Sequence, residues 1–124
     1  MGLIWAESFT WPPSGNLLMR ASWKRRRLYP SKAYREWNAI NLPTVLEGPR
    51  IPTIDYQVRL GLVFQPPDRR AYDLDNRAKA VQDLLVKGGV VKDDSARFLN
   101  PVNLSGVDPV KGEPGYVIAS LYTL

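Results

Sequence analysis

Ile54 to Gln65 read IDYQVRLGLVFQ, the clearest strand pattern in the sequence. Large apolar side chains occupy every second position from Ile54 to Phe64, and mostly polar residues or glycine stand between them. Alternation with a period of two residues predicts a long β-strand with one buried face. Pro66 and Pro67 end the strand, because proline has no backbone N–H to donate to a sheet.

The periodicity beyond this strand is helical. Apolar residues from Leu74 to Val86 recur close to the i, i+3, i+4, i+7 pattern, which predicts a helix with one apolar face. Gly88-Gly89 supplies its C-terminal stop. A second helix is predicted from Lys32, with Ser31 as its N-cap, and Pro43 limits it or forces a restart. Its partly apolar face consists of Ala33, Tyr34, Trp37, Ile40 and Asn41.

Three further strands are predicted, at residues 3–10, 96–104 and 116–122. The last of these is apolar on both faces, which favours a position inside the sheet. The prolines of residues 11–16 stop any regular element, and a basic loop is expected to follow as far as Pro30. This order predicts an α+β fold, in which two main helices pack on a mixed β-sheet.

Composition narrows the chemistry. The 124 residues suit a single domain, residues 1–124. They include no cysteine and no histidine, which excludes disulfides, thiolate or imidazole metal ligands, and Ser-His-Asp or Cys-His catalysis. Any bound metal must be held by oxygen atoms, which favours Mg²⁺, Mn²⁺ or Ca²⁺. No run of about 18 apolar residues and no secretion signal is present, so we expect a cytoplasmic protein without a membrane partner.

Charge is distributed unevenly along a chain of net charge +5. Seven basic residues and no acid lie in one stretch: Arg20, Lys24, Arg25, Arg26, Arg27, Lys32 and Arg35. Half of the twelve acids lie between Asp68 and Asp94. A basic chain with one acidic cluster predicts nucleic-acid binding around a cation site, and the alternative is a solvated basic loop.

The acidic cluster begins with Asp73-Leu74-Asp75-Asn76 at the predicted start of a helix. Neighbouring carboxylates repel each other, and a divalent cation relieves that repulsion. Mg²⁺ takes one or two carboxylates together with water and phosphate oxygens. Asp93 or Asp94 supplies a third carboxylate if the chain turns back alongside the helix, and the spacing does not choose between them. The alternative is that the acids only complement the helix dipole.

A lysine stands one helical turn from the acidic pair. Asp75, Lys79 and Asp83 follow at i, i+4 and i+8, and therefore lie on one face of the helix. Beside a metal ion, Lys79 can contact the scissile phosphate or neutralise developing charge. The alternative is an ordinary surface ion pair between lysine and aspartate.

These motifs together resemble the RusA-type Holliday junction resolvases, small endonucleases of phages and prophages. The resemblance rests on Trp11-Pro12-Pro13-Ser14-x-Asn16, Asp68-Arg69-Arg70, Asp73-Leu74-Asp75-Asn76, Lys79, Asp83 and Asp93-Asp94 in this order. It implies a homodimer that binds four-way DNA junctions and resolves them by paired symmetric nicks in recombination and repair. It also implies a requirement for Mg²⁺, for which Mn²⁺ can substitute.

The resemblance also assigns roles. It makes Asp73, Asp75 and Asp94 the catalytic, metal-binding acids and Lys79 the essential lysine. Candidate DNA contacts are Arg69, Arg70 and Asn76 beside the acids, and Arg20, Lys24, Arg25, Arg26, Arg27 and Lys32 in the basic stretch. Tyr72 departs from the family pattern, because a basic residue often precedes the first acid. A broader nuclease for flaps and forks, or a DNA-binding protein without activity, remain the alternatives.

Overall fold

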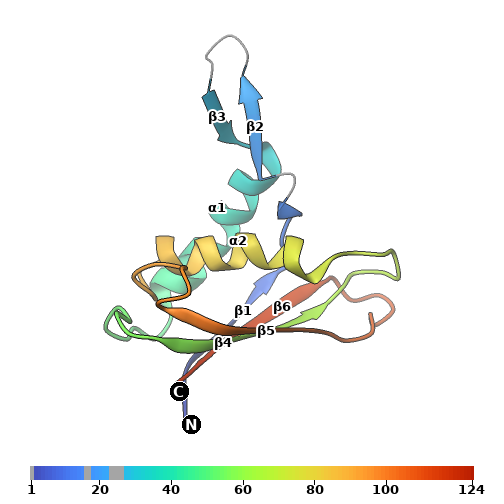
Figure 1. The fold of residues 1–124 in the computed structure, drawn as a ribbon. Helices are drawn as coiled ribbons and strands as arrows, with labels where there is room; N and C mark the ends of the chain where they lie inside the picture. Colours follow the sequence, from blue (N-terminus) through green and yellow to red (C-terminus); the bar gives the residue numbers. More distant parts are fainter. Residues whose placement is uncertain (1, 16–17, 23–26) are drawn as a thin grey trace.

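The computed structural model describes residues 2–15, 18–22 and 27–124 (Figure 1). Its elements follow one another as β1 (Leu3–Thr10), β2 (Met19–Ser22), β3 (Arg27–Pro30), α1 (Lys32–Glu47), β4 (Val58–Gln65), α2 (Leu74–Lys87), β5 (Leu99–Gly106) and β6 (Tyr116–Tyr122). Two helices and a four-stranded mixed sheet confirm the predicted α+β class.

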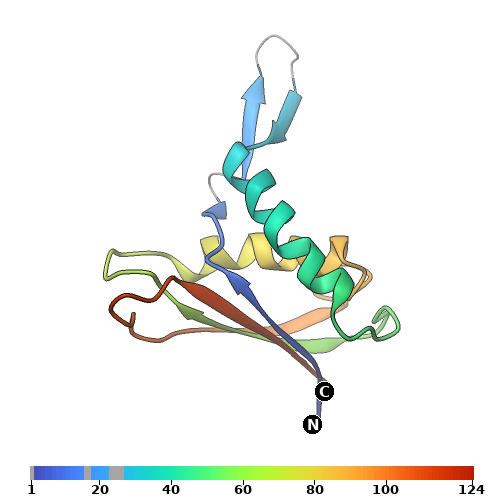
Figure 2. The same ribbon diagram turned by 180° about the vertical axis from the view of Figure 1, so that it is seen from behind.

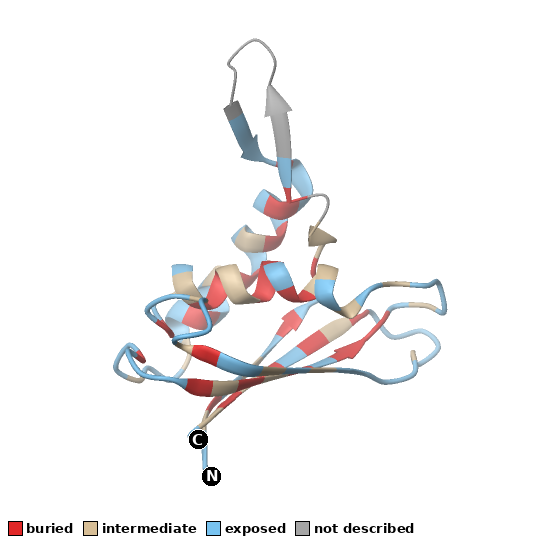
Figure 3. Ribbon diagram, viewed as in Figure 1, coloured by how far each residue is buried: buried red, intermediate tan, exposed pale blue. Residues whose placement is uncertain are grey.

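The sheet has the strand order β1-β6-β4-β5, in which β6 is antiparallel to both its neighbours and β4 is parallel to β5. Both helices lie on the same face of it (Figures 1 and 2). Burial alternates along the strands accordingly (Figure 3). The internal position predicted for β6 is confirmed, but only one of its faces is buried: Val117 and Leu121 are inaccessible, whereas Ile118 is 38% exposed.

The prediction that the strand starts at Ile54 is wrong. Leu60, Leu62 and Phe64 of β4 are fully buried as the alternation predicts, but the paired strand starts at Val58. Ile54 instead forms an isolated parallel bridge with Val91. Alternation marks which side chains are apolar, whereas a strand extends only as far as its neighbours pair with it.

Helix α1 begins at its predicted cap, where the Ser31 hydroxyl accepts a hydrogen bond of 3.2 Å from the Tyr34 backbone N–H. Three residues of the predicted apolar face are buried, namely Tyr34, Trp37 and Asn41. The other two, Ala33 and Ile40, are exposed. The buried side of the helix continues instead to Val45, so the prediction was wrong at its edges.

Pro43 does not end α1, which continues through it to Glu47. The helix is anchored on both sides of the proline, because Asn41 and Val45 are both buried. The Asn41 side chain accepts a hydrogen bond from the Thr10 backbone N–H (3.0 Å) and donates one to the Thr10 hydroxyl (2.9 Å). The Trp37 indole N–H donates to the Thr10 carbonyl (2.9 Å). Tertiary contacts to the end of β1 thus offset the helical hydrogen bond that proline removes.

The basic loop expected before Pro30 is instead a hairpin of β2 and β3, paired antiparallel from Met19–Pro30 to Ser22–Arg27. Figure 1 shows it projecting beyond the first turn of α1, away from the four-stranded sheet. The Ser31 N–H donates to the Leu18 carbonyl at the base of the hairpin (2.8 Å). Of the basic stretch, Lys24, Arg25 and Arg26 lie outside the described residues, as do the side chains of Arg20 and Arg27.

The predicted helix from Leu74 is confirmed and ends at Lys87, followed by Gly88 as its C-cap. The strand predicted at residues 96–104 begins later, at Leu99, and runs to Gly106. Pro101 is tolerated within it because β5 is an edge strand, where one side of the backbone needs no partner.

Gly88, at the end of α2, lies close against Val45 of α1. A β-carbon at this position would overlap the buried side chain of Val45. The backbone conformation of Gly88 is ordinary for any residue (φ −78°), so the requirement is one of space.

We therefore expect Gly88→Ala to lower the free energy of unfolding by about 1–3 kcal/mol through overpacking. Adding Val45→Ala should recover part of this loss. Gly61→Ala is the matched control, because the nearest atom to its new β-carbon lies 3.7 Å away. Urea unfolding monitored by circular dichroism measures all variants, and equal stability of Gly88→Ala and the wild type would contradict the close approach.

Candidate metal and DNA-binding site

The acidic pair lies at the start of α2, directly after the loop that follows β4. Asp73 is the N-cap and has an extended backbone, but its carboxylate accepts no hydrogen bond from the backbone of the first turn. It accepts one of 3.1 Å from the side-chain amide of Asn76 instead. Asp75 stands exposed in the first turn, where its charge complements the helix dipole. Among the described residues, the Asp75 carboxylate has no hydrogen-bond or ion-pair partner.

The segment after α2 turns back alongside the helix, as the sequence required. The Val90 N–H donates to the Leu85 carbonyl (2.9 Å), and the Lys92 N–H donates to the Ile54 carbonyl (2.9 Å). This return brings the Asp94 carboxylate to the Lys79 ammonium, at 3.4 Å between Oδ2 and Nζ. The spacing left Asp93 and Asp94 open, and only Asp94 contacts Lys79.

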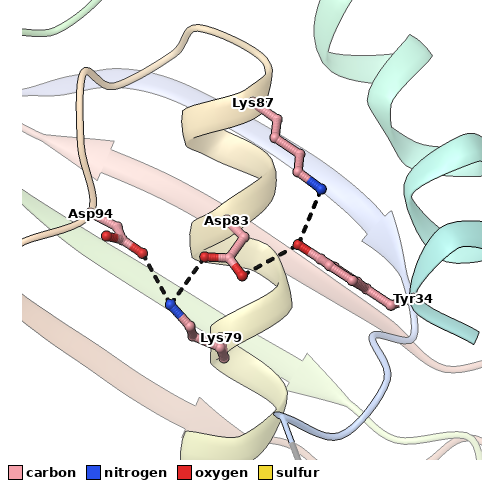
Figure 4. Close-up of polar contacts among 5 residues, drawn as sticks. All are labelled: Tyr34, Lys79, Asp83, Lys87 and Asp94. Atoms are coloured by element: carbon pink, nitrogen blue, oxygen red, sulfur yellow. Dashed lines mark hydrogen bonds and ion pairs between the residues drawn. The ribbon is translucent and has the colours of Figure 1, made fainter. Parts of the chain in front are cut away.

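Lys79 lies between two carboxylates (Figure 4). Its ammonium donates to Asp83 Oδ1 at 3.1 Å as well as to Asp94. The hydrogen bond with Asp83, aided by the charges of both aspartates, raises the pKa of Lys79 above its ordinary value. Lys79 is therefore a cation at neutral pH, and this suits it to contact phosphate oxygens and not to act as a general base.

The second oxygen of Asp83 links the site to α1. It accepts a hydrogen bond of 3.3 Å from the Tyr34 hydroxyl, to which the Lys87 ammonium donates in turn at 3.4 Å (Figure 4). Tyr34 is only 4% exposed. The sequence placed Tyr34 on the apolar face of α1 but missed this link; the available signal was its hydroxyl, because a buried tyrosine needs a polar partner.

The predicted metal ligands fit a hard divalent cation in their chemistry, since all three are carboxylates and two of them crowd the first turn of α2. In the described part of the chain, however, no three carboxylates lie close enough together to hold a metal ion. The assignment of Asp73, Asp75 and Asp94 as metal ligands therefore stays a prediction.

The basic residues predicted to contact DNA are placed as follows. Arg69 is exposed in the loop before α2. Arg70 is bound to Asp68 at 2.7 Å, and this pairing lowers the pKa of Asp68 and raises that of Arg70. Lys32 lies in the first turn of α1, at the base of the hairpin, and forms an exposed ion pair with Glu36 at 3.7 Å. Their contacts with DNA stay predictions.

The chain belongs to the endodeoxyribonuclease RusA family, whose model matches residues 11–110. Among its relatives, the crossover junction endodeoxyribonuclease RusA of Enterobacteria phage 82 is 33% identical over 87 residues, which cover 68% of this chain and 69% of the relative. The protein of the same name from Aquifex aeolicus is 28% identical over 86 residues, 69% of this chain and 67% of the relative. That from Escherichia coli K12 is 32% identical over 87 residues, with coverages of 68% and 69%. The resemblance seen in the sequence is thus confirmed.

No helix in the described ranges has the length and apolar character needed to cross a membrane.

We expect Tyr34→Phe to lower the free energy of unfolding by about 1–2 kcal/mol, because it removes a buried hydroxyl that binds one charged group as donor and another as acceptor. Tyr56→Phe is the control, since Tyr56 is 51% exposed. Urea unfolding measures both. If the two variants are equally stable, the Tyr34 hydroxyl does not anchor Asp83.

Proposed function

We propose that this protein is a Mg²⁺-dependent endonuclease that resolves four-way DNA junctions. The observation that carries the proposal is the return of Asp94 to Lys79, which lies one turn after Asp75 on α2, within the region matched by the endodeoxyribonuclease RusA family. The relatives named above are crossover junction endodeoxyribonucleases. The described residues share one hydrophobic core, which supports a single endonuclease domain over residues 1–124.

In this proposal Asp73, Asp75 and Asp94 hold the divalent cation, Mg²⁺ or Mn²⁺. When bound there, such an ion would supply an activated water and charge stabilisation at the phosphate. Lys79 supplies a fixed positive charge for the non-bridging phosphate oxygens, and Asp83 holds its ammonium in place. The chain contains no histidine, and this chemistry needs none, because a metal ion can activate the water and stabilise the leaving oxygen without an imidazole.

DNA is held, in the same proposal, by basic groups that contact phosphates without reading sequence. The hairpin of β2 and β3 projects beyond the body of the molecule (Figure 1), and Lys32 follows it at the start of α1. Arg69 and Arg70 lie in the loop leading to the acids. A homodimer with two-fold symmetry would present two such sites to two strands of like polarity, and this would produce paired symmetric nicks. A cytoplasmic location is part of the proposal.

The test incubates the protein with synthetic four-way junctions, forks, flaps and plain duplexes, in Mg²⁺, Mn²⁺ or EDTA. Symmetric nicks on junctions alone, dependent on the metal, support the proposal. Equal cleavage of forks and flaps would replace it by a broader branched-DNA nuclease. Tight binding without cleavage in either metal would leave a DNA-binding protein without activity.

Asp75→Asn should lower junction cleavage by more than about a hundredfold, because even groups that only orient a metal ligand are typically worth ten- to a hundredfold. Junction binding should stay the same or tighten, because the change removes a charge that repels phosphate. Single-turnover cleavage and fluorescence anisotropy measure the two effects. Normal cleavage by this variant would contradict the assignment of the metal ligands.

Asp83→Asn should slow cleavage by about ten- to a hundredfold while affecting junction binding little, because an amide has no negative charge and only one acceptor oxygen, so it cannot accept from both Tyr34 and Lys79. Glu36→Gln is the matched control: it removes the acid of another i, i+4 pair, Lys32–Glu36, which is more exposed. The same cleavage assay compares them. Equal rates for the two variants would show that Asp83 forms only a surface ion pair.

A further inference from the structure

A pocket of about 310 Å³ opens beside the start of α2. It is lined by Trp11, Pro66, Pro67, Asp68, Arg70, Ala71, Tyr72 and Arg77. Tyr72 directly precedes Asp73, and Arg77 lies one turn after it, so the pocket adjoins the predicted metal ligands without including them. None of the roles proposed above uses Trp11, Tyr72 or Arg77.

Two aromatic rings form one wall of the pocket. Trp11 packs edge to face with Tyr72, with ring centroids 5.1 Å apart, and with buried Phe64 at 6.0 Å. The Tyr72 ring has room because residue 106 is glycine: a β-carbon there would lie 2.5 Å from the Tyr72 hydroxyl. Neither the indole N–H of Trp11 nor the Tyr72 hydroxyl has a hydrogen-bond partner in the described part of the chain.

Arg77 adds a half-buried positive charge to this wall. Its guanidinium lies over the Trp11 ring, 5.4 Å from the centroid, and donates to the Pro12 carbonyl at 2.8 Å. Burial lowers the pKa of Arg77, and no carboxylate in the described ranges forms an ion pair with it. A cation withdrawn from water with only a neutral partner is suited to an anionic ligand.

The proline-rich motif near the N-terminus holds this arrangement in place. Pro12 accepts the hydrogen bond of Arg77, and the chain at Gly15 packs so closely on α2 that a β-carbon there would lie 2.9 Å from the Asn76 carbonyl oxygen. The motif therefore fixes Trp11 and Arg77 relative to the first turn of α2.

We propose that this pocket binds one nucleotide of the DNA strand beside the cleavage site, with its base against Tyr72, Trp11 and Arg77 and its phosphate on the Arg77 guanidinium. Bases pack on aromatic rings and on guanidinium planes, and the unpaired indole and hydroxyl groups can bond to a base edge. Tyr72 directly precedes Asp73, so this chain offers an aromatic ring beside the predicted metal ligands. The inference rests on the proposed function.

The test scans the base half of the proposal with a set of four-way junctions, each carrying one abasic residue near the crossover. Binding is measured by fluorescence anisotropy in EDTA, so that it does not depend on cleavage. For the wild-type chain, one abasic position should weaken binding by about tenfold, the size expected for the loss of one base–aromatic contact. Tyr72→Leu should bind the intact junction about tenfold more weakly and lose nothing further at that position. The matched control Tyr56→Leu, an exposed tyrosine before β4, should behave as the wild type.

The phosphate half is tested by an uncharged methylphosphonate at the linkage next to that position. The methylphosphonate should weaken junction binding of the wild type and of the control variant Arg97→Gln, which changes an exposed arginine. It should not weaken junction binding of Arg77→Gln. If the wild type binds and cleaves intact junctions but shows no sensitive abasic position, the pocket proposal is overturned and the proposed function stands. If intact junctions are neither bound nor cleaved, the proposed function fails and the pocket assignment fails with it. The abasic scan uses the wild-type chain, so a variant that does not fold leaves this test intact.

Discussion

One face of α2 is buried against the sheet, and this packing fixes the position of the candidate site. Ala78, Val81, Leu84 and Leu85 are almost fully buried, so the helix can neither rotate nor slide without exposing them. Its first turn therefore presents Asp73 and Asp75 at one fixed place, and the polar face, with Lys79 and Asp83, is directed to α1 and the returning chain. At its other end, Gly88 lets the helix approach Val45 of α1 closely.

Three parts of the chain meet around the Lys79–Asp83 pair. Asp83 comes from the same helix, Asp94 from the return after it, and Tyr34 from α1 (Figure 4). Partly exposed ion pairs alone are weak, because water competes for both partners. The buried Tyr34 hydroxyl makes the difference, since its position is set by core packing and it holds one oxygen of Asp83 while the other binds Lys79. Core packing thus positions Tyr34, Tyr34 positions the Asp83 carboxylate, and Asp83 positions the Lys79 ammonium.

Sequence patterns predicted well those elements that a local cap, a helical period or an unbroken apolar run defines. The α2 helix, the Ser31 cap and the internal strand β6 fall in this group. The patterns were wrong where tertiary contacts override them. Pro43 sits inside α1 because Asn41 and Trp37 bind Thr10, and the basic stretch pairs as a hairpin that its composition does not reveal.

Composition limits the chemistry that this protein can use. Without histidine or cysteine, a metal site must use oxygen, and the ordered set of motifs from Trp11 to Asp94 indicated the family. Only the tertiary structure decided that Asp94, and not Asp93, meets Lys79, that Tyr34 holds Asp83, and that Trp11 joins Tyr72 and Arg77 around one pocket. The physical reason is that periodicity reports the contacts of residues a few positions apart. Pairs such as Tyr34 and Asp83, or Trp11 and Tyr72, are brought together by the packing of whole elements, which no local pattern records.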